Sequence, residues 1–252
     1  MTPTRRQFLI IAGISAVGVV CPSAARLMAS RSESPKATGL KARRWAMVVD
    51  AAKCRADCTD CFTACHNAHN VPDIGNPKEE VKWIWSDRFD YVFHAESHAH
   101  IPEAMRTRPV PILCNHCDNP PCVRVCPTGA TFRRPDGIVM MDSHRCIGCK
   151  ICLAACPYGA RSINFRNPRP FIRKLNPDFP TRSKGVIEKC NFCEERLAKG
   201  ILPACVMACE EKALVFGDVE DPHSEVRHLL DRKFTICRRA ELGTKPQVYY
   251  IL

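Results

Sequence analysis

The stretch CIGCKICLAACP, residues 146–157, carries the strongest structural signal in the chain. Its four cysteines are spaced C-x2-C-x2-C-x3-C and a proline follows the last of them. At this spacing three thiolates can wrap one [4Fe-4S] cluster, while the cysteine before the proline points away and can bind a neighbouring cluster. The stretch therefore predicts a fold built around more than one iron-sulfur cluster.

Sixteen of the 18 cysteines fall into four groups of this kind, and only Cys21 and Cys237 stand apart. The first group is Cys54, Cys58, Cys61 and Cys65, the second is Cys114, Cys117, Cys122 and Cys126, the third is Cys146, Cys149, Cys152 and Cys156, and the fourth is Cys190, Cys193, Cys205 and Cys209. The spacing among the first three cysteines differs from group to group, but the last two cysteines of every group are spaced C-x3-C. Sixteen thiolates of this pattern predict four [4Fe-4S] clusters as cofactors.

The second and third groups are adjacent, so the rule of the fourth cysteine can be applied to them directly. We expect each cluster to take three cysteines from one group and one from the other. The two expected sets are Cys114, Cys117 and Cys122 with Cys156, and Cys146, Cys149 and Cys152 with Cys126.

Two other uses of the cysteines stay open at this point. Zinc takes four tetrahedral ligands from separated pairs, which would suit the fourth group alone. Disulfides would suit export to an oxidising compartment, although they do not account for repeated four-cysteine runs. A covalently attached haem would need C-x-x-C-H, which the chain lacks.

An internal repeat accompanies the cysteines. Alanine recurs four residues after the last cysteine of three groups, at Ala130, Ala160 and Ala213, and each begins a short strand-like segment. In the first group His69 takes this position. Between the second and third groups, RRPDGIVMMD places a turn between two extended runs and predicts a β-hairpin.

The repeat predicts an α+β fold of two pseudo-symmetric ferredoxin-like modules, one inserted in the other, with long loops. The inserted module would be residues 108–165, and the outer module would be residues 40–107 and 166–252. WAMVVD near the front and QVYYIL near the end are candidate strands of the outer module. Residues 166–189 are rich in proline and charge and predict a long connecting loop.

Residues 1–29 have the parts of a signal peptide, since Arg5 and Arg6 precede an apolar run and small residues follow it. TRRQFL at residues 4–9 resembles the twin-arginine export signal, and the resemblance implies a periplasmic protein that is exported after folding. A signal peptide is usually cleaved after export. The alternatives to cleavage are a segment retained as a membrane anchor and a lipidated Cys21. The apolar run of about 13 residues is short of the roughly 20 that a membrane-spanning helix needs.

The net charge of +11 could suggest nucleic-acid binding. Each oxidised cluster with four thiolates carries about −2, so four clusters would offset most of the excess. We therefore expect no nucleic-acid partner.

Three other features have simple structural interpretations. We expect His94, His98 and His100 to lie in a polar surface loop, Trp83 and Trp85 to pack in the core, and Cys237 to be a small buried side chain.

Several stretches resemble a known family. CNHCDNPPCVRVCPTGATF, HRCIGCKICLAACPYGARSINF and EKCNFCEERLAKGILPAC are similar to the cluster motifs of four-cluster ferredoxin-like subunits of respiratory complexes, such as those of dimethyl sulfoxide reductase and formate dehydrogenase. CTDCFTACHNAHNVP, EEVKWIW, RSKGVIEKCNFC and LGTKPQVYYIL resemble, more closely, the DsrO-type subunits of Dsr transmembrane complexes in sulfur metabolism.

The resemblance implies a non-catalytic electron-transfer subunit with no catalytic residue of its own. It implies the sets Cys54, Cys58 and Cys61 with Cys209, and Cys190, Cys193 and Cys205 with Cys65. It also implies two partners, a polytopic quinone-reactive membrane subunit (DsrP-like) and a multihaem cytochrome c subunit (DsrJ-like). Two alternatives stay open: an electron-transfer subunit of a molybdenum-enzyme or hydrogenase complex, and a reductase whose substrate meets an exposed cluster.

Overall fold

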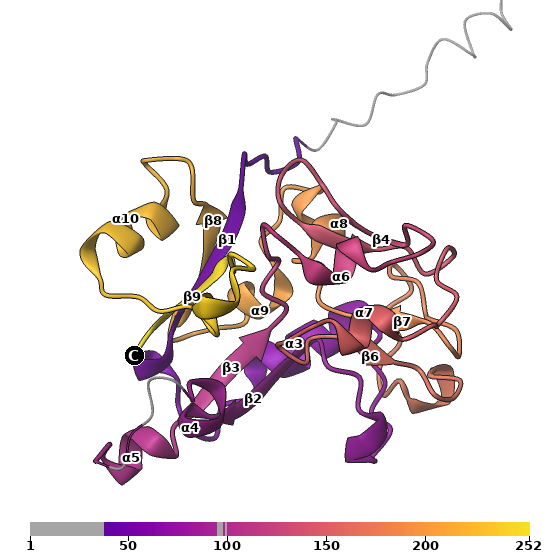
Figure 1. The fold of residues 1–252 in the computed structure, drawn as a ribbon, viewed down its shortest axis with the longest axis horizontal. Helices are drawn as coiled ribbons and strands as arrows, with labels where there is room; N and C mark the ends of the chain where they lie inside the picture. Colours follow the sequence, from indigo (N-terminus) through magenta and orange to yellow (C-terminus); the bar gives the residue numbers. More distant parts are fainter. Residues whose placement is uncertain (1–37, 95–97, 99) are drawn as a thin grey trace, which may run out of the picture. The chain divides into compact units, whose positions relative to one another are not determined.

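The computed structural model describes residues 38–94, 98 and 100–252, so the expected signal segment, residues 1–29, lies outside the described residues. The largest sheet joins the two ends of the described chain (Figure 1). Its central strand β1 (Trp45–Asp50) is antiparallel to β8 (Leu214–Asp218) and parallel to β9 (Val248–Ile251). The prediction of strands in WAMVVD and QVYYIL is thereby confirmed.

This sheet is covered on both faces because successive side chains of β1 point to opposite sides. Ala46 and Val48 pack with Val226 of α10 (Glu225–Arg232) on one face. Met47 and Val49 point the other way, into the main hydrophobic core that also contains cysteines of the first and fourth groups. Both faces of β1 carry apolar residues because both are covered. The face with Met47 and Val49 shares its core with the cysteines.

The other strands form three two-stranded sheets. They pair β2 (Ile84–Arg88) with β3 (Pro109–Leu113), β4 (Thr131–Arg133) with β5 (Val139–Met141), and β6 (Ser162–Ile163) with β7 (Ile187–Glu188), all antiparallel. The second of these is the hairpin predicted in RRPDGIVMMD, closed by a hydrogen bond from the Arg134 amide to the Ile138 carbonyl.

The segment 166–189 is a long connection, as predicted, but it is not loop throughout. It contains the short 3-10 helix Arg169–Phe171 and ends in strand β7, which pairs with β6. The sequence missed β7 because a strand of two residues shows no alternating pattern. The β6–β7 pair bears on the site because Cys190 lies two residues after the end of β7.

In the part of the chain that the structure describes, most helices are single turns and none is longer than the ten residues of α3 (Asp60–His69). Those of four residues are α4 (Phe89–Val92), α5 (Glu103–Arg106), α6 (Pro121–Arg124), α7 (Ile151–Ala154), α8 (Glu194–Leu197) and α9 (Ala204–Met207). Helix α3 (Asp60–His69) is longer and ends at Asn70, whose φ of 54° is left-handed. The other 3-10 turns are Ala51–Lys53, Pro77–Glu79 and Ala240–Leu242.

This mixture of short helices and strands agrees with the predicted α+β class. Within the described ranges, no helix has the length and apolar character required to cross a membrane. Trp83 is buried, as expected, with 2% of its surface exposed, whereas Trp85 is partly buried. The exposed residues His94, His98 and His100 lie in a surface loop, again as expected.

Candidate iron-sulfur centres

The third cysteine of every group is the second residue of a helix. These cysteines are Cys61 in α3, Cys122 in α6, Cys152 in α7 and Cys205 in α9. In α6, α7 and α9 the helix stops after one turn, so the last cysteine of the group lies beyond it. In α3 the helix continues, and Cys65 lies inside it. The first group departs from the repeat for this reason.

Three sets of four cysteines each line one cavity. The largest of these three cavities, about 230 Å³, is lined by Cys54, Cys58, Cys61 and Cys209. A second cavity is lined by Cys114, Cys117, Cys122 and Cys156, and a third by Cys126, Cys146, Cys149 and Cys152. We call these sets site I, site II and site III.

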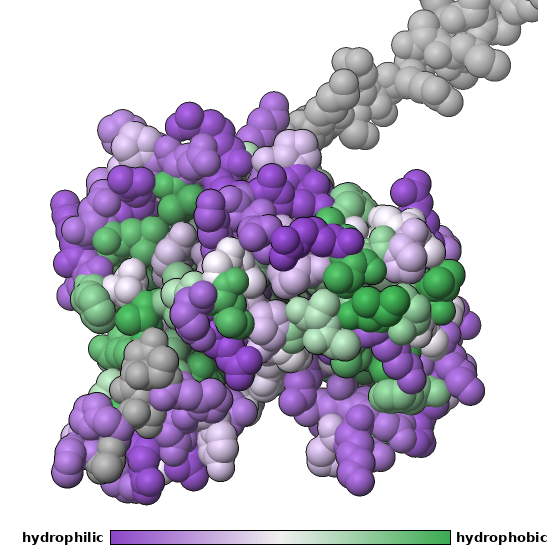
Figure 2. Space-filling model, in the orientation of Figure 1, coloured by the Kyte–Doolittle hydropathy of each residue, from purple (hydrophilic) through white to green (hydrophobic). Residues whose placement is uncertain are grey.

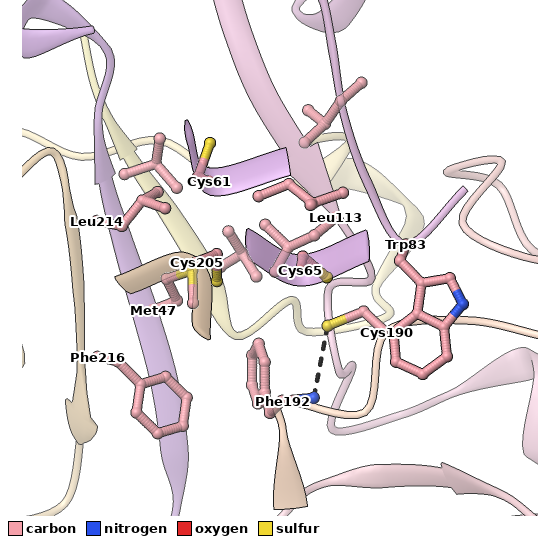
Figure 3. Close-up of a cluster of buried hydrophobic side chains, with 14 of the residues drawn as sticks. Met47, Cys61, Cys65, Trp83, Leu113, Cys190, Phe192, Cys205, Leu214 and Phe216 are labelled. Carbon is pink, nitrogen blue, oxygen red and sulfur yellow. Dashed lines mark hydrogen bonds between the residues drawn. The ribbon is translucent and has the colours of Figure 1, made fainter. Parts of the chain in front are cut away.

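Of the sixteen grouped cysteines, the last four, Cys65, Cys190, Cys193 and Cys205, are all buried, and we call them site IV. Burial raises the pKa of Cys65 well above its usual value, and its neighbours Cys205, Cys190 and Cys193 raise it further. Figure 3 shows Cys65, Cys190 and Cys205 coming from separate segments into the same hydrophobic cluster.

Each site thus combines thiols from two groups. Cys209 lines site I with the first group, although it is only four residues from Cys205. A zinc site made of the fourth group alone does not match this arrangement, because that group is divided between two sites. All 17 cysteines in the described part of the chain are free thiols, so disulfides do not account for the pattern there either.

Backbone amides point at the sulfur atom of the last cysteine in three groups, at Cys126, Cys156 and Cys209. The Ala213 amide donates to Cys209 Sγ over 3.2 Å. Burial by itself raises the pKa of the Cys126 thiol, but amides including that of Ala130 outweigh it, and the net pKa is lowered. The recurring alanines are nearly fully buried against these sulfurs. Amide donors of this kind stabilise a thiolate that binds metal.

The buried thiols are unfavourable as free anions. Burial, with help from nearby thiols, raises the pKa of Cys54 to about 11 and that of Cys61 to about 12. Burial likewise raises the pKa of Cys190 to about 12. A metal that binds these sulfurs as thiolates must therefore displace protons, which couples metal binding to the formation of the core.

The donor set fits [4Fe-4S] clusters, since sites I–III each offer four sulfurs around a cavity, and site IV offers four buried sulfurs that include the amide-bonded Cys190 and Cys193. The mixed group His69, Cys193 and Glu195, whose ligand atoms lie within 4.8 Å of one another, borders site IV. His69 Nε2 is 3.0 Å from Glu195 Oε1, and His69 Nδ1 is 2.9 Å from the Cys65 carbonyl. His69 and Glu195 are therefore engaged with each other and the backbone, beside the four thiols.

Some polar residues around the sites were not predicted from the sequence. His69, noticed only as a break in the repeat, stacks on Trp83 with ring centroids 4.4 Å apart. The Trp83 indole donates to the buried Glu188 over 3.0 Å, and burial raises the Glu188 pKa. Arg161 lines site II and is also buried. A charged residue next to a cluster motif is the only signal that could have indicated them.

The four sites are neighbours in a definite order. Burial is the largest cause that raises the pKa of Cys152, Cys190 and Cys205. In each case a thiol of a neighbouring site also raises the pKa: Cys122 acts on Cys152, Cys114 acts on Cys190, and Cys61 acts on Cys205. These pairs join site III to site II, site II to site IV, and site IV to site I. All cysteines of site IV are buried, whereas Cys149 of site III is exposed.

Substitution of Gly148 tests how the loop between Cys146 and Cys149 holds site III. Its φ is +66°, and a Cβ there would lie 2.2 Å from the Gly185 carbonyl oxygen. We expect Gly148→Ala to displace the loop between Cys146 and Cys149, to release iron from site III, and to cost about 1–3 kcal/mol of stability. Iron per chain and thermal unfolding would measure both effects.

Gly159→Ala is the matched control, because Gly159 has a φ of +65° and open space around its Cβ position. It should show the cost of the left-handed backbone without loss of iron. Equal iron loss in the two variants would contradict the role of the close contact with Gly185.

Four thiol sites in a row, in a short-helix α+β fold, define a ferredoxin-like iron-sulfur protein that transfers electrons. The 4Fe-4S dicluster domain family matches residues 105–168 and 175–219. The chain is 39% identical over 271 residues to the Hdr-like menaquinol oxidoreductase iron-sulfur subunit 1 of Archaeoglobus fulgidus, covering 98% of this chain and 97% of that protein.

Two further relatives match the whole chain. A tetrathionate reductase subunit of Salmonella typhimurium is 34% identical, with 100% of this chain and 89% of that protein covered. Protein NrfC of Escherichia coli is 36% identical, with 100% and 96% covered. The chain belongs to this family of iron-sulfur electron-transfer subunits of oxidoreductases. Its cofactors are [4Fe-4S] clusters, and the sixteen cysteines of sites I–IV provide for four of them.

Proposed function

We propose that this protein passes electrons, one at a time, between a quinone-reactive membrane subunit and a multihaem cytochrome c subunit, in a complex of dissimilatory sulfur metabolism. The observation that carries the proposal is the row of four thiol sites, with the buried site IV inside and exposed or partly exposed thiols at both ends. Such a row is a path for electrons through the protein.

The proposed ligand sets are the four sites themselves. They are Cys54, Cys58, Cys61 and Cys209; Cys114, Cys117, Cys122 and Cys156; Cys126, Cys146, Cys149 and Cys152; and Cys65, Cys190, Cys193 and Cys205. When bound, a [4Fe-4S] cluster takes up and releases a single electron at a potential that its surroundings set. The protein's part is to hold the thiolates, supply amide donors and exclude water from site IV.

The proposal includes the two-module architecture. Sites II and III draw all their cysteines from residues 108–165, the proposed inserted module. Sites I and IV draw theirs from residues 40–107 and 166–252, the proposed outer module. This division of the thiols supports a ferredoxin-like pair inserted within another pair.

The site III end is apolar. Ile147 is 68% exposed, Ile151 is 48% exposed and Phe165 is 46% exposed. Figure 2 shows hydrophobic surface in the region where α7 lies in Figure 1. Large exposed apolar residues around a redox site are typical of a permanent interface. We assign this end to the membrane subunit.

The site I end is charged. Arg55, Asp57 and Glu211 are exposed and line its cavity. Arg55 lies 3.6 Å from Glu211 in an ion pair. Charged rims steer transient partners and tolerate water. We assign this end to the soluble haem partner.

Two observations support the quinone and sulfur assignments. One relative is named as part of a menaquinol oxidoreductase, and the linking stretches of this chain resemble DsrO-type subunits. The tetrathionate reductase relative favours a second candidate, a subunit that serves a molybdenum-enzyme or hydrogenase complex. Both candidates imply a periplasmic protein exported by the twin-arginine route, because Arg5 and Arg6 precede an apolar run.

Purification of a tagged chain from its own membranes in mild detergent tests the proposal. We expect a polytopic protein and a haem-staining cytochrome c to copurify, and menadiol, a menaquinol analogue, to reduce the clusters in the assembly faster than in the isolated subunit. Ile147→Glu with Ile151→Glu should detach the membrane protein. The control Phe234→Glu, at a residue 85% exposed, should leave it bound.

Copurification with a large reductase subunit and no cytochrome would favour the second candidate. Equal reduction by menadiol of the assembly and of the isolated subunit would contradict a quinone-reactive partner.

A further inference from the structure

Arg161 is a buried charge at the boundary between sites II and III. Only 4% of its surface is exposed. Its Nη1 donates to Thr131 Oγ1 over 3.0 Å and lies 3.8 Å from the Met141 sulfur. Its Nη2 is buried and has no hydrogen-bond partner among the described residues. A guanidinium held this way has an unused donor, which is costly unless another acceptor is present.

Two of the thiol sites lie next to this guanidinium. Arg161 lines the cavity of site II together with Cys114, Cys117, Cys122 and Cys156. Met141, whose sulfur is the one 3.8 Å from Arg161 Nη1, lines the cavity of site III. Burial alone lowers the pKa of Arg161, but the thiolates of Cys122, Cys152 and Cys114 outweigh burial and raise it. The guanidinium with the free donor therefore lies beside the cavities of both sites.

The internal repeat shows that this charge is specific to one junction. Arg161 directly follows the recurring Ala160, and the corresponding residues after Ala130 and Ala213 are Thr131 and Leu214. Thr131 and Arg161 meet in the hydrogen bond described above. Leu214 is buried and lines the cavity of site I. The repeat position is therefore cationic between sites II and III and apolar at site I.

We propose that Arg161 is a positioning residue that holds a fixed positive charge and a free N–H donor between sites II and III, and thereby raises the reduction potentials of both centres. The inference rests on the proposed ligand sets. A guanidinium stays charged at any physiological pH. Because reduction adds negative charge to a cluster, a nearby cation stabilises the reduced form, and an N–H donor to sulfur acts in the same direction.

The effect is large because the guanidinium is buried. For a unit charge about 10 Å from a cluster, at an effective dielectric constant of about 20, Coulomb's law gives roughly a tenfold change in the ratio of reduced to oxidised cluster at a fixed potential. A tenfold change corresponds to about 59 mV for one electron. The reduction potentials of sites II and III should both be raised by this charge, whereas those of sites I and IV should not.

The test is a redox titration of the purified, iron-loaded protein followed by electron paramagnetic resonance. In Arg161→Met, which removes the charge, we expect two of the four centres to titrate at lower potential by about the amount above. Arg161→Lys keeps a charge and should leave both centres close to wild type. The control Arg133→Met removes an exposed arginine of β4 and should move no centre.

Unchanged potentials in an iron-loaded Arg161→Met, or equal shifts in all four centres, would overturn the inference while leaving the proposed function intact. If neither Arg161→Met nor Arg161→Lys loads iron, Arg161 serves folding alone and the inference is also overturned. A wild-type protein with fewer than four titrating centres would overturn the proposed function together with the inference.

Discussion

Replacing Cys126 with serine is expected to damage the cluster of site III and to spare site II, although Cys126 lies only four residues after Cys122 of site II. Cys126 lines the same cavity as Cys146, Cys149 and Cys152. A serine hydroxyl is a poor replacement for a thiolate ligand, so this cluster should be lost or converted. The wild type should hold about 16 iron and about 16 sulfide per chain, four of each per cubane.

Electron paramagnetic resonance can decide which cluster is affected if matched variants are compared. Cys149→Ser marks site III, and Cys117→Ser marks site II. Cys126→Ser should lose the same spectral component as Cys149→Ser. Conversely, Cys156→Ser should behave like Cys117→Ser. A Cys126→Ser spectrum that matches Cys117→Ser would mean that each group closes on its own cluster.

Much of this architecture is visible in the sequence because cluster ligation is local. Three cysteines of each group lie on one short loop and helix, so their spacing alone predicts a common site. The strands β1 and β9 were also predictable, since WAMVVD and QVYYIL are long enough to show their character. The hairpin of β4 and β5 follows from its Pro-Asp-Gly turn.

Residues that meet only after folding were not predictable in the same way. His69 pairs with Glu195 across 126 positions, and Trp83 bonds to Glu188 across 105. Neither pair has a local pattern. Arg161 follows a cluster motif, but its contact with Thr131 depends on the two repeats packing together. Such contacts follow from the tertiary arrangement, which the spacing of cysteines does not specify.

Removing the iron is expected to unfold most of the described chain. Thiols of sites I and IV, including Cys61, Cys65, Cys190 and Cys205, belong to the main hydrophobic core. The helices around them are mostly single turns, which do not form alone in water. In zinc-finger peptides one structural zinc ion contributes about 10–16 kcal/mol, which is comparable with the whole stability of about 5–15 kcal/mol of a domain, and metal binding here is coupled to folding in the same way.

Treatment with a chelator and an oxidant should therefore abolish the cooperative thermal transition and much of the circular dichroism signal. Anaerobic addition of iron and sulfide should restore both. An iron-free protein that melts within a few degrees of the holoprotein would contradict a core that depends on its clusters.

The loss should also be staged, because the sites differ in exposure. Cys149 of site III is exposed, whereas all four thiols of site IV are buried. A chelator should reach site III early and site IV last. Iron release and unfolding, followed together, should then separate: the first iron should leave with little change in circular dichroism, and the transition should collapse only when site IV is emptied. If unfolding instead accompanies the first iron lost, the outer sites must be as essential to the core as site IV, and the proposed division between buried and peripheral centres would be wrong.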